Sequence, residues 1–310
     1  MAEAGAAWVA GTVRARAIGR RRLGAVAIHH LAASPSVTDA VDALVRSPYG
    51  RYVHAGDSLA TAQRGVAETL LWNVRVLAGW LPARGARALR ALAGWFEIAN
   101  VDERLQDWAG RPAAPPFRMG ALATAWPRLA SATSPPELRT ELAASAWSDP
   151  GGATPRDIQL GMRLSWAQRV TTVVPPAAEW AAGAVALLVA RERFVRAAAL
   201  PDQAAAAVTR ILGADWAAAT SIDDLAGRVR PAGRWAVRGI RSTAELWRAE
   251  AVWWARLRAD GLKLLAGSGF AATRPLGAVA VLAVDAWQVS AALALAARGG
   301  GTLEVIDGLA

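Results

Sequence analysis

The chain has 310 residues and no cysteine, which excludes disulfide bonds, thiol catalysis and cysteine-based zinc sites. Hydrophobic residues make up 54% of it, which is ample for a core, and the net charge of +10 comes from arginine, since Lys263 is the only lysine. Abundant alanine, leucine and arginine favour helix, and alternating β-branched runs are nearly absent. The sequence predicts an all-α fold.

The chain begins with an Arg-rich amphipathic helix predicted over residues 8–33, in which Val9, Val13, Ala17 and Ile18 face inward. Its arginines are expected to face outward, toward a partner: Arg14, Arg16, Arg20, Arg21 and Arg22. The N-terminus has no basic head followed by a long apolar run, so it is a poor signal peptide, and a cytoplasmic protein is expected.

The first unit continues with a helix at 37–47, whose N-cap is Ser36, and a strongly periodic helix at 57–80. A further helix at 84–109 ends before Gly110 and carries one apolar stripe. Beside that stripe run Glu97, Asn100, Arg104 and Asp107 at helical spacing. Such a polar stripe is either a ligand site or a set of groups that bond to one another or to a facing helix.

Two proline-rich or irregular segments divide the rest of the chain. The stiff connector RPAAPP at 111–116 opens a second helical unit, and a boundary near 214–220 opens a third. The predicted units are therefore 1–110, 111–215 and 216–310.

Three features recur between these units. Asp285 and Gln288 lie 188 residues after Glu97 and Asn100, on a helix that ends at glycines. Ser134 and Ser221 are predicted helix N-caps like Ser36, and each cap leads to an aromatic residue, at Tyr49, Trp147 and Trp235. Half of the 188-residue offset, 94, falls near Arg191–Val195, a segment that contains Arg193 and Phe194. We interpret the chain as one helical unit used three times.

Catalytic and metal-binding motifs are missing from the sequence. His29 and His30 point about 100° apart on a helix and cannot share a metal, and His54 has no spaced partner. There is no phosphate-binding glycine loop and no nucleophile elbow. The sequence therefore predicts a protein that is not an enzyme, with no cofactor and no small-molecule substrate.

Two alternatives concern membranes and nucleic acids. Residues 275–297 carry one charge, Asp285, and are long enough to cross a bilayer. A carboxylate near the middle would cost about 2.5–3.5 kcal/mol there, so a buried core helix is the preferred interpretation. The basic charge would suit a helical repeat protein that binds nucleic acid, but the arginines are spread along the chain and no aromatic stacking motif accompanies them.

Several segments resemble the C subunits of the V/A-type rotary ATPases, a family whose eukaryotic members are called d subunits. The segments of the first unit that resemble it are VRARAIGRRRL (13–23), SVTDAVDALVRSPYGRYV (36–53) and WFEIANVDERL (95–105). The opening of the second unit, SPPELRTELAASAW (134–147), and the last helix, AVLAVDAWQVSAALAL (280–295), are also similar to it. The second unit departs from the pattern at Ala190 and Arg193, and the third at Gln288.

The resemblance implies a non-catalytic adaptor of the central stalk, built as a pseudo-threefold helical funnel. Members of the family lie on the cytoplasmic face of the membrane, against the rotating proteolipid ring, and receive the D and F subunits of the shaft. We therefore expect a peripheral membrane location, a role in ion transport through torque transmission, and these partners.

Overall fold

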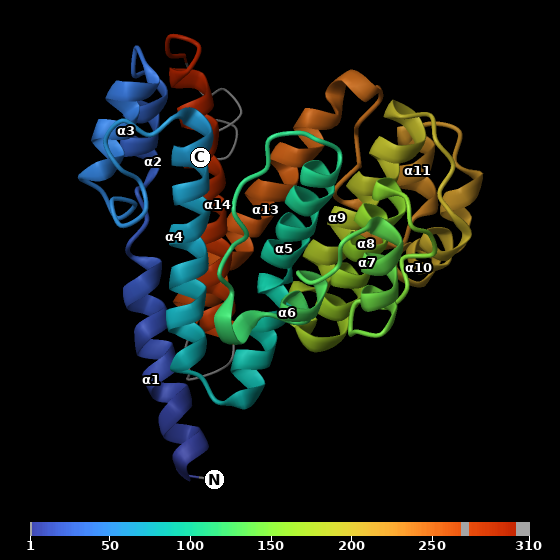
Figure 1. The fold of residues 1–310 in the computed structure, drawn as a ribbon, viewed down its shortest axis with the longest axis horizontal. Helices are drawn as coiled ribbons and strands as arrows, with labels where there is room; N and C mark the ends of the chain where they lie inside the picture. Colours follow the sequence, from blue (N-terminus) through green and yellow to red (C-terminus); the bar gives the residue numbers. More distant parts are fainter. Residues whose placement is uncertain (1, 268–272, 302–310) are drawn as a thin grey trace. The chain divides into compact units, whose positions relative to one another are not determined.

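The computed structural model describes residues 2–267 and 273–301 (Figure 1), and this part of the chain contains fourteen α-helices and no strand, so the all-α prediction is confirmed. Contacts between residues group the chain into two compact units, Met1–Ala86 with Trp254–Ala310, and Arg87–Trp253. Helices α5 (Ala83–Trp108) and α13 (Leu246–Ala266) run through the two boundaries between these units. The threefold division at 110/111 and 215/216 stays a prediction.

The first unit combines the two ends of the chain. Its remaining helices are α1 (Ala2–Gly19), α2 (Ala25–Ala32), α3 (Val37–Val45), α4 (Leu59–Gly79) and α14 (Thr273–Ala296). Helix α14 packs against α1, α2, α3 and α4, and lies beside α4 in Figure 1. One core cluster joins residues from both chain ends, including Ile28, Leu44 and Val53 with Val289 and Leu293.

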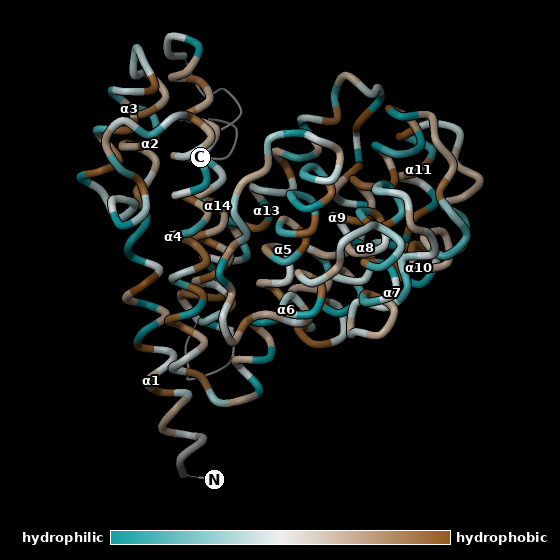
Figure 2. The backbone as a smooth tube through the Cα atoms, viewed as in Figure 1, coloured by the Kyte–Doolittle hydropathy of each residue, from teal (hydrophilic) through white to brown (hydrophobic). Residues whose placement is uncertain are grey.

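The second unit is the continuous stretch between them. Its helices are α6 (Trp126–Leu129), α7 (Pro135–Ala143), α8 (Pro155–Val173), α9 (Ala178–Ala190), α10 (Asp202–Leu212), α11 (Ile222–Arg228) and α12 (Pro231–Arg234). Short 3-10 turns lie at Gly120–Leu122, Pro175–Ala177, Asp215–Ala218 and Thr243–Glu245, and a π-helical segment, Arg191–Val195, follows α9. Figure 2 shows hydrophilic and hydrophobic residues recurring along the helices, as expected where one face is buried.

The local start and stop signals work as predicted. The side chains of Ser36, Ser134 and Ser221 accept hydrogen bonds from backbone N–H groups at the starts of α3, α7 and α11, which confirms all three N-caps. Helix α5 ends at Trp108, and Gly110 follows with a φ of 68°, in the left-handed region that glycine adopts readily.

The predicted helix over 8–33 is wrong in two respects. It is two helices, α1 and α2, because Gly24 has a φ of 83° and begins α2. Its predicted inward face is correct at Ile18, which is buried, but wrong at Val9 and Val13, which are 40% and 61% exposed, and at Ala17, which is also exposed. In a helix this rich in alanine both faces are apolar, and the local pattern therefore does not select the buried one.

Helix α14 is the membrane-span candidate among the described residues, by length and hydropathy. Within the structure, 61% of its most apolar window is buried. Asp285, its only charge between residues 275 and 296, is 3% exposed. A buried core helix stays the preferred interpretation, because most of this window packs against the rest of the first unit.

Close helix packing at Gly183 gives a first prediction. A Cβ added there would lie 2.6 Å from Trp235 Cζ2 and 3.1 Å from Trp253 Cδ1, so an indole would have to move. We expect Gly183→Ala to lower the free energy of unfolding by about 1–3 kcal/mol through overpacking. Gly227→Ala, on the exposed helix α11 with no atom within 4 Å of the new Cβ, is the control and should be neutral or slightly stabilising. Equal urea midpoints for the two variants would contradict this packing.

Candidate functional site

Glu97 forms a buried node that joins α5 to the segment that follows it. Its side chain is completely buried, and it accepts hydrogen bonds from the backbone N–H groups of Thr124 and Ala125, at 2.7 and 2.8 Å. The indole Nε1 of Trp147 donates a third, at 2.7 Å. A carboxylate only accepts hydrogen bonds. The three donors that converge on Glu97 therefore satisfy both of its oxygens.

Arg169, a half-buried residue on α8, contacts two members of this node. Its Nη2 donates to Thr124 Oγ1 at 3.0 Å, and its guanidinium lies 4.9 Å from the centroid of the Trp147 ring. Burial lowers the pKa of Arg169 below its ordinary value, and the negative charge of Glu97 opposes that shift. Glu97 and Arg169 therefore act as a partly buried charge pair bridged by Thr124 and Trp147.

Asp285, on α14, forms a second node of the same kind in the first unit. It accepts hydrogen bonds from the backbone N–H groups of Leu23 and Gly24, at 2.9 and 3.2 Å, and from the hydroxyl of Tyr49 at 2.7 Å. These contacts join residues up to 262 positions apart. Gln288 is buried one turn further along α14.

Asn100 and Arg104 continue the polar stripe of α5. The side-chain amide of Asn100 donates to the carbonyl of Phe117 at 3.1 Å and accepts from its N–H at 2.6 Å. Arg104 donates to the carbonyls of Ala130 and Ala132, at 3.5 and 3.1 Å. Asn100 and Arg104 therefore hold the backbone of residues 117–132, which lies outside helices at the bonded positions, rather than one another or a facing helix.

Arg193 makes contacts like those of Arg104, not those of Asn100. It donates to the carbonyls of Trp216 and Ala217, at 2.9 and 2.8 Å, in the turn before the N-cap Ser221. Arg104 likewise bonds the turn before the N-cap Ser134. These contacts favour a pairing of Arg193 with Arg104, whereas the sequence pairs Arg193 with Asn100 and Ala190 with Glu97; the repeat register stays a prediction.

The arginines of α1 and the turn after it were expected to face a partner. Arg16, Arg20 and Arg21 are exposed. Arg22 is half-buried and its Nε donates to the carbonyl of Gly19, at 2.9 Å. Arg14 is half-buried, with its guanidinium 5.6 Å from the ring centroid of Trp80. Contact with a partner stays a prediction for all five.

Sequence reasoning did not identify two charged residues. Arg169 had no sequence signal, because it reaches the node from a helix 72 positions further along the chain. Glu192 is 3% exposed in the π-helical segment and pairs with Arg156 and Arg196, at 2.8 and 2.9 Å. Its alternation with arginines in RERFVR was the available signal.

The nodes organise the backbone and show no arrangement for bond chemistry. Both carboxylates are occupied by donors of the chain itself, and among the described residues no group of three His, Asp or Glu side chains could hold a metal ion. A scan against models of known protein families found no match, and a search of curated proteins found no similar sequence.

The buried phenol of Tyr49 gives a prediction about pH. Burial first, and then the charge and hydrogen bond of Asp285, raise the pKa of Tyr49 well above its ordinary value of 10.0. A raised pKa in the folded state stabilises the fold below the unfolded pKa, and this contribution is lost as pH rises above about 10 toward the folded value. We expect tyrosinate absorbance from Tyr49 to appear only with alkaline unfolding.

Only two tyrosines contribute to this signal, Tyr49 and Tyr52, so Tyr49→Phe isolates it. The tyrosinate absorbance that the wild type shows and Tyr49→Phe lacks should rise at the same pH at which circular dichroism reports unfolding. Ionisation of Tyr49 in the folded chain near pH 10 would contradict the buried hydrogen bond.

Proposed function

We propose that the chain is a non-catalytic adaptor of the central stalk in a V/A-type rotary ATPase, related to the C subunits of these enzymes. In this role it would rest on the proteolipid ring at the cytoplasmic face of the membrane and receive the D and F subunits of the shaft. The single observation that carries the proposal is the pair of matching nodes at Glu97 and Asp285, because the resemblance rests on a repeated helix with an acid at this position.

The two nodes match in every donor type. Each acid accepts from two consecutive backbone N–H groups and from one aromatic side chain, Trp147 or Tyr49. Each aromatic residue lies 13 positions after its N-cap serine, Ser134 or Ser36. Ser145 and Ser47, two residues before the aromatic in each segment, each bond a leucine carbonyl and accept from the N–H of that aromatic residue. Agreement at this level supports duplication of one unit.

Further pairs support a third copy between them. Trp166 and Trp253 donate to carbonyls of Leu92 and Trp180, at 3.4 and 2.9 Å. Gly94 and Gly183 give close approach to matching tryptophans, Trp147 and Trp166 in one case, Trp235 and Trp253 in the other. Gly94 to Gly183 and Arg104 to Arg193 are both offsets of 89 residues.

The offset of 89 places Ala186 opposite Glu97 and Val189 opposite Asn100, so this copy lacks the acid. Consistent with that, the indole Nε1 of Trp235 donates to the carbonyl of Ala232, at 2.8 Å, where Trp147 donates to a carboxylate. Loss of the acid is tolerated when its former donor finds another acceptor, as the Trp235 indole does, because an unpaired buried donor is costly.

The pseudo-threefold funnel is part of the proposal. Helix α5 and the α9 region, through Arg193, each bond the segment that follows them, whereas α14 bonds and packs against residues 23–53 from the start of the chain. In a tandem of three copies, this connectivity arises when the segment at the start of the chain packs on the helix of the third copy. A body fixed by such long-range nodes would resist deformation, which transmission of torque to a shaft requires.

Copurification tests the proposal. A tagged native protein should bring down the proteolipid and the D and F subunits in fixed ratio from detergent-solubilised membranes, and neighbouring genes should encode catalytic, shaft and proteolipid subunits. Recovery of the native protein as a free monomer, without ring and shaft, would exclude the role.

Binding of nucleic acid is the second candidate function. The observation in its favour is that Arg16, Arg20 and Arg21 are exposed and close in sequence. Phosphate contacts give an affinity that falls steeply with salt, so a titration of labelled RNA and DNA at several salt concentrations separates the candidates. Salt-sensitive binding together with a missing ring would favour this second function.

A further inference from the structure

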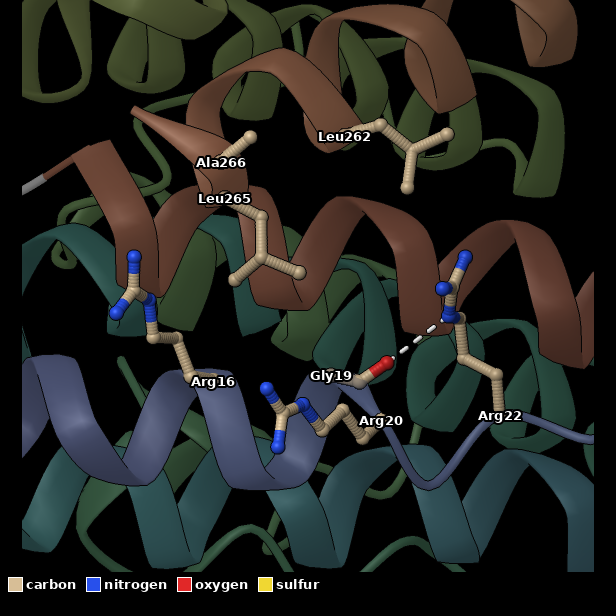
Figure 3. Close-up of a pocket in the computed structure, with 7 residues that line it drawn as sticks. All are labelled: Arg16, Gly19, Arg20, Arg22, Leu262, Leu265 and Ala266. Carbon is tan, nitrogen blue, oxygen red and sulfur yellow. Dashed lines mark hydrogen bonds between the residues drawn. The ribbon is translucent and has the colours of Figure 1, made fainter. Parts of the chain in front are cut away.

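A hollow of about 360 Å³ lies in the first unit, between the C-terminal end of α1 and the last turns of α13 (Figure 3). One wall is cationic and the other aliphatic. Its lining is Arg16, Gly19, Arg20, Arg22, Leu262, Leu265 and Ala266. Figure 3 shows the side chains of Leu262 and Leu265 reaching from α13 toward the arginine side.

The cationic wall is not neutralised by the described part of the chain. Within residues 2–267 and 273–301, no carboxylate forms an ion pair with Arg16, Arg20 or Arg22. Arg22 donates a hydrogen bond from Nε to the carbonyl of Gly19. This bond orients the guanidinium group and does not involve its two terminal nitrogens. Arg16 and Arg20 are one helical turn apart and exposed. Three like charges around one hollow favour an anion there.

We propose that this hollow binds an acidic phospholipid, with the headgroup on the arginine side and the first carbons of the acyl chains against Leu262 and Leu265. A planar guanidinium fork matches phosphate oxygens in pairs. The aliphatic wall gains by removing methylene groups from water, a contact that a free phosphate ion does not make. The volume falls in the range of sites for small ligands.

The dimensions distinguish a lipid from an acidic helix of a partner protein. A docked helix uses a groove with anchors spaced over several turns, whereas this hollow lies at one helix end and is lined by seven residues. One headgroup with the top of its acyl chains matches a single cationic pocket beside an apolar wall. The proposal stands whether or not the chain is a rotor adaptor, because it depends only on this hollow.

Vesicle flotation tests the charge contribution. The full chain should float with vesicles that contain phosphatidylglycerol and much less with pure phosphatidylcholine. The double variant Arg16→Gln with Arg20→Gln should lose about tenfold or more in affinity, since each arginine near an acidic surface contributes several-fold. The matched control, Arg46→Gln with Arg298→Gln, removes two exposed arginines of the same unit that do not line the hollow. Equal losses in the two double variants would show diffuse attraction and overturn the site.

A second variant tests the apolar wall, with thermal unfolding as the check on folding. Leu262→Asn leaves the charge unchanged and should weaken binding of soluble short-chain phosphatidylglycerol several-fold. If it has no effect, and inorganic phosphate competes as well as the short-chain lipid does, the hollow is a phosphate site and the lipid assignment is wrong. Stronger competition by an acidic peptide than by the short-chain lipid would likewise overturn it, in favour of a partner protein.

Discussion

Glu97→Gln is expected to lower the free energy of unfolding of the second unit by about 3 kcal/mol. The amide keeps the shape of the side chain but turns one acceptor into a donor. The new amide NH2 group would face either the N–H of Thr124 or the N–H groups of Ala125 and Trp147. A buried donor without an acceptor costs about 1–3 kcal/mol. Removal of the negative charge also leaves Arg169 partly buried beside a neutral group.

The measurement is urea unfolding together with amide hydrogen exchange. The amides of Thr124 and Ala125 should lose protection before the rest of the unit, because their acceptor is weakened. Glu141→Gln is the control, since Glu141 pairs with Arg128 in a partly exposed ion pair and such pairs contribute about 0–1 kcal/mol. If the two variants are equally stable, Glu97 does not hold this segment.

Asp285→Asn is expected to have an effect of similar size, about 3 kcal/mol, in the first unit. Here too an amide would meet three donors, from Leu23, Gly24 and Tyr49, of which an Asn cannot satisfy all. The substitution should release the turn after α1 from α14. Arg20, Arg21 and Arg22 immediately precede the bonded N–H groups, so this turn should become a faster site of tryptic cleavage.

Limited proteolysis and urea unfolding measure these two consequences separately. Asp42→Asn is the matched control, an exposed acid on α3 in the same unit, and should leave both unchanged. A double-mutant cycle with Tyr49→Phe should give a coupling of about 0.5–3 kcal/mol, because the phenol and the carboxylate are in direct contact. Cleavage at wild-type rate in Asp285→Asn would remove the basis for this node.

The resemblance to the rotary-ATPase family makes these two acids comparable. In that interpretation they are equivalent positions of one repeated unit, and the middle copy, with Ala186 in place of the acid, is held by other contacts such as Arg193 with Trp216. The copurification experiment addresses the function, and the two acid variants address the architecture on which it depends.

The sequence alone determined the features that depend on residues close together in the chain. A serine cap and its helix interact over three or four residues, a glycine ends a helix where it occurs, and helical periodicity is read over two turns. For this reason the all-α class, the caps at Ser36, Ser134 and Ser221, and the end of α5 before Gly110 were predicted correctly.

The tertiary structure decided what depends on residues far apart. Periodicity placed Val9 and Val13 inward, but the buried face of α1 is set by α14 and α4, from other parts of the chain. The two acids were predicted to share a repeated position, but their hydrogen-bond partners lie 27 to 262 residues away. The carbonyls that Arg193 bonds, in Trp216 and Ala217, are likewise more than twenty residues away in the chain. Local propensity is encoded in neighbours along the chain, whereas the pairing of buried polar groups is selected when distant segments pack together and every donor must find an acceptor.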